Sequence, residues 1–415
     1  MKSSHKDNAA KWIITFALCL FAERASCTNS FTFATFAGQS GSSGTNDGLG
    51  PAARFELPAF LAVDGSDNLY VADQGNHTIR KVSPIGFVTT LAGQAGVEGS
   101  TDGAVNVARF RNPGSVVLDS FGNVFVADSG NRTVRKITPS GTVTTLAGSP
   151  GAFGSADGLG SAARFSGLGG IAIDRANNLY LAELGNKTIR KITPAGAVST
   201  LAGLAGVAGT ADGAGTTARF DDPIGIALDN TGNIFVTDRF VHTIRKITPD
   251  GTVSTFAGLA GADGSTDGVG SAARLSQPLG ITVDAANNLF ITEQVGTNGR
   301  IRKVTASGLV ATVSTNELPA SGLVADSSGN LFSTFFSQGI VQKGVGPSAL
   351  GLGVFPVLAL DYSVGTRLRI EVTSSLSDSN NWATLTNITV SSSPQYFVDT
   401  NSPLSLRRFY RAVRP

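Results

Sequence analysis

The sequence predicts an all-β protein, in which a six-bladed β-propeller closed by an N-terminal strand is followed by a small C-terminal β domain. Three observations support this: a 55-residue repeat, four short strand patterns in each copy, and an N-terminal segment that supplies the strand missing from the last copy. We expect a signal peptide over residues 1–27, the propeller over 31–345, a linker over 346–356 and a small β-sandwich-like domain over 357–415.

The repeat is visible in single residues as well as in pattern. An Arg-Phe dipeptide, an aspartate that ends an apolar strand, and an Arg-Lys dipeptide each recur every 55 residues. The arginines of Arg-Phe are Arg54, Arg109, Arg164 and Arg219, the aspartates are Asp64, Asp119, Asp174, Asp229 and Asp284, and the arginines of Arg-Lys are Arg80, Arg135, Arg190 and Arg245. In the fifth copy Arg-Lys arrives two residues late, which indicates an insertion around 295–299.

Each copy reads as four short apolar strands separated by Gly, Asn and Pro turns, which is the pattern of a propeller blade. In the third copy the strands are expected at Ile171–Asp174, Leu179–Glu183, Thr188–Ile192 and Ala197–Ala202. The strands are apolar almost throughout because both faces of a blade pack on neighbours.

A sixth, reduced copy has only three strand patterns, at 322–326, 330–335 and 339–343. The segment FTFATFAG at 31–38 matches the fourth-strand segment VSTFAG at 253–258. We therefore expect the N-terminal segment to complete the sixth blade and close the ring.

These repeats resemble the NHL family. The segments GIALDNTGNIFVTD (225–238) and NKTIRKITPAG (186–196) are similar to its V-D-x-x-G-N-x-Y-V-x-D strand pair followed by N-x-x-I-x-K. The resemblance implies a propeller but no single activity, since the family includes binding scaffolds, lyases and lactonase-like relatives.

The N-terminus has the layout of a secretory signal peptide, with Lys2, Lys6 and Lys11 before an apolar run from Trp12 to Ala22. The run is too short to span a bilayer, so no transmembrane span is expected in the mature chain. We expect a secreted protein, either extracellular, periplasmic or at the cell surface, with lipidation of Cys27 as an alternative fate.

The composition limits the partner. Of 415 residues, 41% are hydrophobic and 15% charged, and 32 Lys and Arg stand against 30 Asp and Glu. A formal charge of +2 gives no bulk attraction for nucleic acid, which we do not expect as a partner.

The chain order places the second-to-third-strand loops and the long blade-to-blade loops on the same end of the ring. Within the long loops an aspartate and an arginine recur seven residues apart, as at Asp102 and Arg109. We expect the arginine to bond this aspartate and loop carbonyls so that the loop holds one shape, with ligand contact as the alternative. The acids that end the second strands, including Glu183 and Asp238, are expected to accept loop backbone N–H groups.

A ligand site is sought where the sixfold pattern breaks. Arg239-Phe240-Val241 replaces the Gly-Asn loop of other copies, Leu184 follows Glu183, and the insertion begins at Gln294. Blades four and five therefore carry the predicted ligand-binding patch, with Arg239, Phe240 and Gln294 as its members and Glu183 and Asp238 beside them.

Catalytic and metal chemistry find little support. The three histidines exclude a three-histidine zinc site and a credible Ser-His-Asp set: His5 lies in the signal peptide, and His77 and His242 occupy an equivalent loop position. We expect no cofactor and no catalytic residue. Calcium at Asp64–Asn68 is an open alternative to a simple hairpin turn there.

Beyond the linker the repeats stop, and short strands are expected at 368–372, 382–385, 388–390, 396–398 and 409–413. The text SLSDSNNWATLTN resembles small β-sandwich modules at the ends of exported bacterial proteins, in which Trp382 and Phe409 would be core. Two functions remain. One is a non-catalytic secreted scaffold that binds a protein, glycan or small ligand on its long-loop face. The other is a metal-dependent lactonase-like or lyase-like enzyme with an acid-coordinated divalent ion.

Overall fold

The computed structural model describes residues 31–317 and 319–346 and, further on, five strands between residues 357 and 413. The chain divides into two compact units, residues 1–346 and 347–415. The expected signal peptide, Cys27, most of the expected linker and Trp382 lie outside the described residues. None of the helices in the described parts has the length and apolar character that crossing a bilayer requires.

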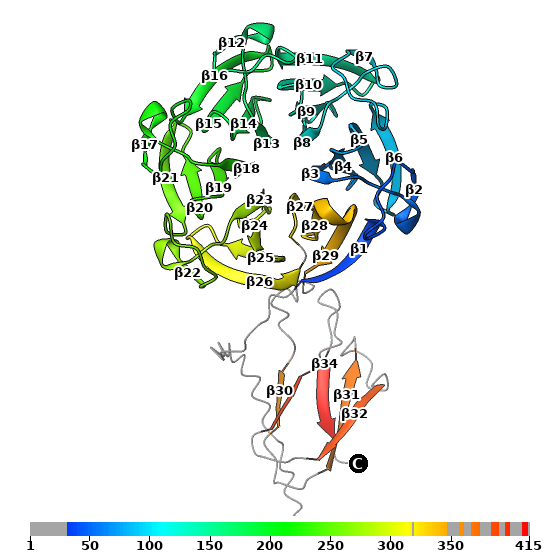
Figure 1. Ribbon diagram of the computed structural model, residues 1–415. Coiled ribbons are helices and arrows are strands. Elements are labelled where there is room, and N and C mark those ends of the chain that lie inside the picture. Colours follow the sequence, from blue (N-terminus) through cyan, green and yellow to red (C-terminus); the bar gives the residue numbers. More distant parts are fainter. Residues whose placement is uncertain are drawn as a thin grey trace, which may run out of the picture. The chain divides into compact units, whose positions relative to one another are not determined.

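The first unit is a ring of six antiparallel sheets, which confirms the predicted propeller (Figure 1). The strands of blade one are β2 (Gly48–Leu49), β3 (Pro58–Val63), β4 (Leu69–Asp73), β5 (Thr78–Val82) and β6 (Phe87–Ala92). Those of blade two are β7 (Gly103–Ala104), β8 (Pro113–Leu118), β9 (Val124–Asp128), β10 (Thr133–Ile137) and β11 (Thr142–Gly148). Those of blade three are β12 (Gly158–Leu159), β13 (Leu168–Ile173), β14 (Leu179–Glu183), β15 (Thr188–Ile192) and β16 (Ala197–Ala202).

The second half of the ring repeats this order. The strands of blade four are β17 (Gly213–Ala214), β18 (Pro223–Leu228), β19 (Ile234–Asp238), β20 (Thr243–Ile247) and β21 (Thr252–Ala257). Those of blade five are β22 (Gly268–Val269), β23 (Pro278–Val283), β24 (Leu289–Val295), β25 (Asn298–Val304) and β26 (Leu309–Glu317). Those of blade six are β27 (Leu323–Ala325), β28 (Leu331–Phe335), β29 (Ile340–Val345) and β1 (Thr32–Gly38). The 3₁₀ turns are η1 (Gly50–Ala52), η2 (Gly160–Ala162), η3 (Gly215–Thr217), η4 (Gly270–Ala272) and η5 (Phe336–Gln338).

Ring closure occurs in blade six, as expected. Strand β1 runs antiparallel to β29, with Thr32 opposite Val345 and Gly38 opposite Ile340. Figure 1 shows the two ends of the propeller chain side by side there. The N-terminal segment therefore supplies the outer strand of a blade whose other three strands come from the far end of the ring.

Five blades have one strand more than the four predicted. The additional strand is a two-residue piece of the long loop that pairs with the outer strand of the same blade, as where Gly48 lies opposite Val88 and Leu49 opposite Phe87. Each long loop therefore first runs along the outer edge of its blade and then returns to the axis. Two residues are too few to show an alternating pattern, so the sequence carries no signal for this strand.

The core lies between neighbouring blades and not at the ring's centre. One cluster joins Tyr70 and Ile79 of blade one to Phe110, Val116 and Val126, which belong to blade two and the loop that leads into it. Equivalent clusters repeat around the ring, as expected for strands that are apolar on both faces.

Threonine side chains join the inner parts of the last three blades. The Thr237 hydroxyl accepts from Gly225 N at 2.8 Å and donates to Leu279 O of the next blade at 2.7 Å. Thr292 and Thr334 make the same contact with the first strand of their own blades. Thr237 thereby joins blade four to blade five, and Thr334 joins blade six to blade one by donating to Ala59 O.

The second unit contains a two-stranded sheet, β30 (Val357–Leu360) with β33 (Gln395–Val398), and a three-stranded sheet in the order β32 (Ala383–Thr389), β31 (Arg367–Thr373), β34 (Phe409–Val413). The prediction of two strands at 382–385 and 388–390 was wrong, because a single strand runs through Thr386 and Asn387, which pair with Ile370 and Arg369. Strand β30 was not predicted.

Candidate functional site

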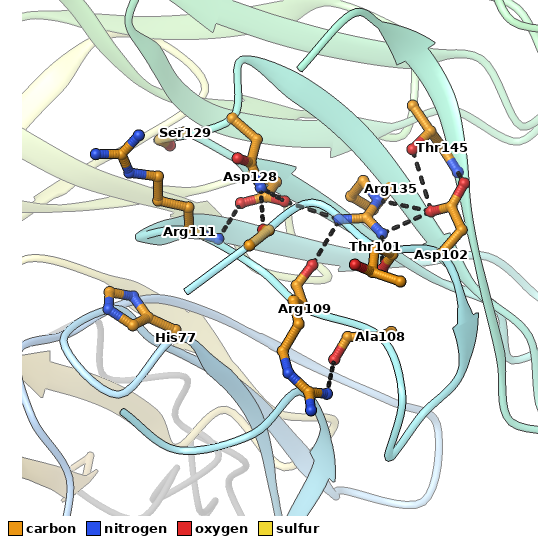
Figure 2. Close-up of polar contacts among 12 residues, drawn as sticks. His77, Thr101, Asp102, Ala108, Arg109, Arg111, Asp128, Ser129, Arg135 and Thr145 are labelled. Carbon is orange, nitrogen blue, oxygen red and sulfur yellow. Dashed lines mark hydrogen bonds and ion pairs between the residues drawn. The ribbon is translucent and has the colours of Figure 1, made fainter. Parts of the chain in front are cut away.

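Each of the first five blades contains a buried arginine that ties the long loop to the blade. These arginines lie on β5, β10, β15, β20 and β25. In blade two, Arg135 is fully buried (Figure 2). Its Nη1 donates to Asp128 Oδ2 at 3.0 Å, and its Nη2 donates to Asp102 Oδ1 at 2.6 Å. The guanidinium lies 5.1 Å from the centre of the Phe110 ring, which explains the phenylalanine of the repeated Arg-Phe dipeptide.

The expected pairing of the loop aspartate with the arginine seven residues later was wrong. Asp102 bonds Arg135 and also accepts from Thr145 N of the outer strand β11 at 2.9 Å. Arg109 instead donates to the carbonyls of Val107 and Ala108, so the other half of the expectation is confirmed. The loop geometry makes residues 33 apart in sequence the true partners.

The acids that end the second strands complete the same unit. Glu183 and Asp238 are fully buried, and each is ion-paired with the arginine of its blade, Arg190 at 3.0 Å and Arg245 at 3.5 Å. Asp238 also accepts from the backbone nitrogen of Asp222 at 2.8 Å, which confirms the predicted role of these acids toward loop N–H groups. Their side chains are thus committed within the blades.

Each unit holds two carboxylates around its buried guanidinium, and one of the two is fully desolvated; in blade five, Arg300 also lies 3.6 Å from Glu293. Burial raises the pKa of Asp73, Asp128 and Asp238 to about 6 and that of Glu293 to about 7, against the partly compensating attraction of the arginines. The pKa of Glu183 is also raised, for the same reason.

A pH dependence of stability follows. Because the folded protein binds these protons more tightly than the unfolded chain, the contribution to stability is full below the ordinary pKa values of 3.8 and 4.5. It is lost as the pH rises from there to the folded pKa values of about 6 and about 7. Each such carboxyl should contribute about 1 kcal/mol more at pH 5 than at pH 7.5. Denaturation by urea at the two pH values measures this, and Asp73→Asn should reduce the difference. An equal or larger difference in that variant would contradict the assignment.

A cavity of about 460 Å³ lies where all six blades meet at the long-loop end of the ring. One set of lining residues lies immediately after β4, β9, β14, β19 and β28 or, in blade five, near the end of the lengthened β24. Another set lies at the second residue of β3, β8, β13, β18 and β23 or just before β27. The first set is Gln74, Ser129, Leu184, Arg239, Gln294 and Phe336, and the second is Ala59, Gly114, Gly169, Ile224, Leu279 and Ser321. The cavity is therefore the mouth of the central channel.

The structure brings Arg239 and Gln294, two residues of the predicted patch, into this lining. Phe240 is 53% exposed and does not line the cavity, but its ring lies 4.3 Å from the Arg239 guanidinium. Glu183 and Asp238 precede lining residues and lie within the blades. Gln74, Ser129 and Phe336 were missed, although the same 55-residue step that gives Arg239 also gives the first two.

Arg239 is held from one side by Asp222, whose Oδ2 lies 2.6 Å from its Nε. Burial raises the pKa of Asp222, and the charge of Arg239 acts against that shift. Beside it, the inserted residues lengthen β24 and β25, so that Val295 pairs with Asn298 in a hairpin that extends beyond Gln294. The break in symmetry at blades four and five is thus real in the structure.

The turn considered for calcium is built as a hairpin. Asp64 Oδ1 accepts from the backbone nitrogens of Ser66 and Asn68 at 2.9 Å, and its pKa is lowered because hydrogen bonds from Asn68, Ser66 and Tyr70 outweigh burial. The described residues contain no group of three or more His, Cys, Asp or Glu side chains placed to hold a metal ion. His77 Nδ1 accepts from Asn112 N at 3.2 Å, a loop contact.

Comparison with known proteins fits this architecture. The NHL repeat family matches residues 55–82, from the Phe of Arg-Phe to the end of β5. Residues 55–82 are thus similar to an NHL repeat and lie in blade one of a six-bladed propeller. Protein SUPPRESSOR OF QUENCHING 1 of Arabidopsis thaliana is 29% identical over 275 residues, which cover 62% of this chain and 26% of that protein. NHL repeat-containing protein 2 of Bos taurus is 28% identical over 274 residues, 58% of this chain and 37% of that protein. The chain therefore spans well under half the length of these relatives.

Solved structures share the propeller fold. A protein of unknown function from Bacteroides thetaiotaomicron superposes with a TM-score of 0.58 at 19% identity, over 76% of each chain. An auxiliary nutrient binding protein from Bacteroides ovatus does so with a TM-score of 0.56 at 15% identity, again over 76% of each chain. A gluconolactonase from Xanthomonas campestris gives 0.50 at 14% identity, over 76% of this chain and 90% of its own. At these identities the likeness establishes the fold alone.

Proposed function

We propose that this NHL-repeat propeller is an exported, non-catalytic scaffold that binds a small molecule in the channel-mouth cavity. The observation that carries the proposal is the cavity itself. Its volume of about 460 Å³ falls within the range of small-molecule sites, and its lining joins apolar side chains to a few polar ones and one guanidinium. The N-terminal segment supports export by its layout.

The contacts of the long loops favour the cavity, and not the loop surface, as the place where a ligand binds. The acids and arginines of these loops already bond other groups of the protein. Asp102, for example, accepts from Arg135, and Arg109 donates to the carbonyl of Ala108. These repeated charges stabilise the loops, whereas the cavity lining differs from blade to blade. Variation of side chains on a fixed frame is what selective recognition of one small ligand requires.

A ligand-observed NMR screen of small metabolites against the full chain tests the proposal. Leu184→Trp should fill the cavity and weaken any true ligand at least tenfold, because Leu184 lines it. Leu204→Trp is the matched control, since Leu204 is 39% exposed on a long loop and outside the lining. Ligands that bind both variants like the parent, or a stoichiometric divalent ion essential for turnover, would contradict the proposal.

A further inference from the structure

We infer that the cavity takes a small carboxylate with an apolar body, and that Arg239 binds the carboxylate. The inference rests on the proposed binding function and adds the chemical class of the ligand. It depends on the state of the Arg239 guanidinium, on the neutrality of the remaining lining, and on the side chains around it.

Arg239 differs from the buried arginines of the ring. Arg135 uses Nε, Nη1 and Nη2 in bonds to loop carbonyls and two aspartates, so nothing remains for a ligand. Arg239 contacts Asp222 through Nε only, and among the described residues its Nη1 and Nη2 have no hydrogen-bond partner. Its side chain is 26% exposed. The guanidinium therefore retains the two-pronged end that matches a carboxylate.

The position of this charge is specific. The five equivalent positions carry neutral side chains, and Arg239 is the one charged residue of the cavity lining as the structure describes it. Contact with the Phe240 ring at 4.3 Å and with Asp222 fixes the guanidinium before any ligand binds. Preorganisation lowers the entropic cost of binding.

The surroundings of Arg239 define the remainder of the ligand. Leu184 of blade three and Ile224 and Leu279 of blades four and five offer apolar surface, and Gln294 adds an amide beside Arg239 along the ring. A small ligand with an anionic end and an apolar body satisfies both. Because Asp222 already neutralises part of the charge of Arg239, a singly charged carboxylate suits the site better than phosphate, which carries nearly two charges.

Asp222 should tune the affinity. Its Oδ2 lies 2.6 Å from Arg239 Nε without good hydrogen-bond geometry, and its backbone N–H is used separately by Asp238. The negative charge of Asp222 repels an incoming carboxylate that binds the Nη1 and Nη2 side of the same guanidinium. Asp222→Asn removes this negative charge while retaining an oxygen for Nε, and should tighten carboxylate binding severalfold, opposite in direction to loss of Arg239.

Isothermal titration of the full chain with hexanoate and phenylacetate, with the neutral hexanamide and phenylacetamide, and with inorganic phosphate tests the inference. We expect the acids to bind at least tenfold more tightly than the amides. Arg239→Gln should remove that preference while leaving the amides unchanged. Arg111→Gln is the matched control, because Arg111 forms an exposed ion pair with Glu98 outside the lining. Melting temperatures verify that each variant is folded.

The outcomes separate the two claims. Amides that bind as tightly as the acids, or acids that bind Arg239→Gln like the parent, would overturn the carboxylate assignment but leave a cavity ligand in place. Phosphate that binds more tightly than either acid would overturn it as well. Acids that do not bind the parent at all would overturn the assignment, and the proposed binding function would fall only if the metabolite screen also found no ligand sensitive to Leu184→Trp.

Discussion

Arg135→Met is expected to lower the free energy of unfolding by about 3–5 kcal/mol, because it leaves the fully buried Asp128 without its cation. The same change removes the hydrogen bonds that Arg135 donates to Asp102 and to the carbonyls of Thr101 and Arg109. Since the pKa of Asp128 is already about 6, the loss should be smaller at pH 5, where this carboxyl can be neutral, than at pH 8. Denaturant unfolding at both pH values measures the effect.

Arg109→Met is the matched control in the same blade. Arg109 donates to loop carbonyls at the surface, and its charge does not neutralise a buried acid as that of Arg135 does (Figure 2). Its replacement should cost less than about 1.5 kcal/mol and show little pH dependence. If both variants lost the same stability, the buried arginine unit would not be the main fastening of the long loop.

Removal of residues 32–37 should destabilise the whole ring and not blade six alone. The deletion removes the partner of β29, the buried Ala37, and the edge-to-face contact of Phe36 with Phe332 at 5.3 Å. A loss on the order of 5 kcal/mol is expected from the hydrogen bonds and apolar burial involved. For a domain of this size the melting temperature should fall by roughly 10 °C or more.

Calorimetry of the deleted chain against a control that lacks only residues 1–30 isolates the role of β1. The control should melt like the parent. A deleted chain that is as stable as the control would show that closure by β1 contributes little, in spite of its pairing with β29.

Much of the fold could be predicted because the repeat aligns weak local signals. In blade three, β14, β15 and β16 have the predicted bounds, whereas β13 begins at Leu168, three residues early, beyond a register shift that sequence patterns do not show. The partner of Asp102 could not be predicted either. Only the path of the loop along the outer edge reveals that Arg135 is nearer than Arg109.

The site was predictable where it departs from the repeat. Arg239 stood out because no other copy has an arginine at that position, and Gln294 because the insertion begins there; both line the cavity. Ser129 and Gln74 did not stand out, since small polar residues are ordinary in loops. Whether an acid is free to bind a ligand also depends on three-dimensional packing. Glu183 and Asp238 stand beside the predicted ligand-binding patch in sequence, yet each is buried in an ion pair with an arginine.

The pairing of β1 with β29 also constrains how the chain reaches its fold. Thr32 can pair with Val345 only after all the intervening blades have been synthesised. Until then β1, the first strand of the propeller in the chain, has no partner strand. Such a contact raises the contact order of the ring and slows its final step. During synthesis or export, a chain that still lacks β29 exposes the unpaired edge of β1, and such an edge is prone to association. A chain truncated before β29 should therefore aggregate, although five of its blades are complete.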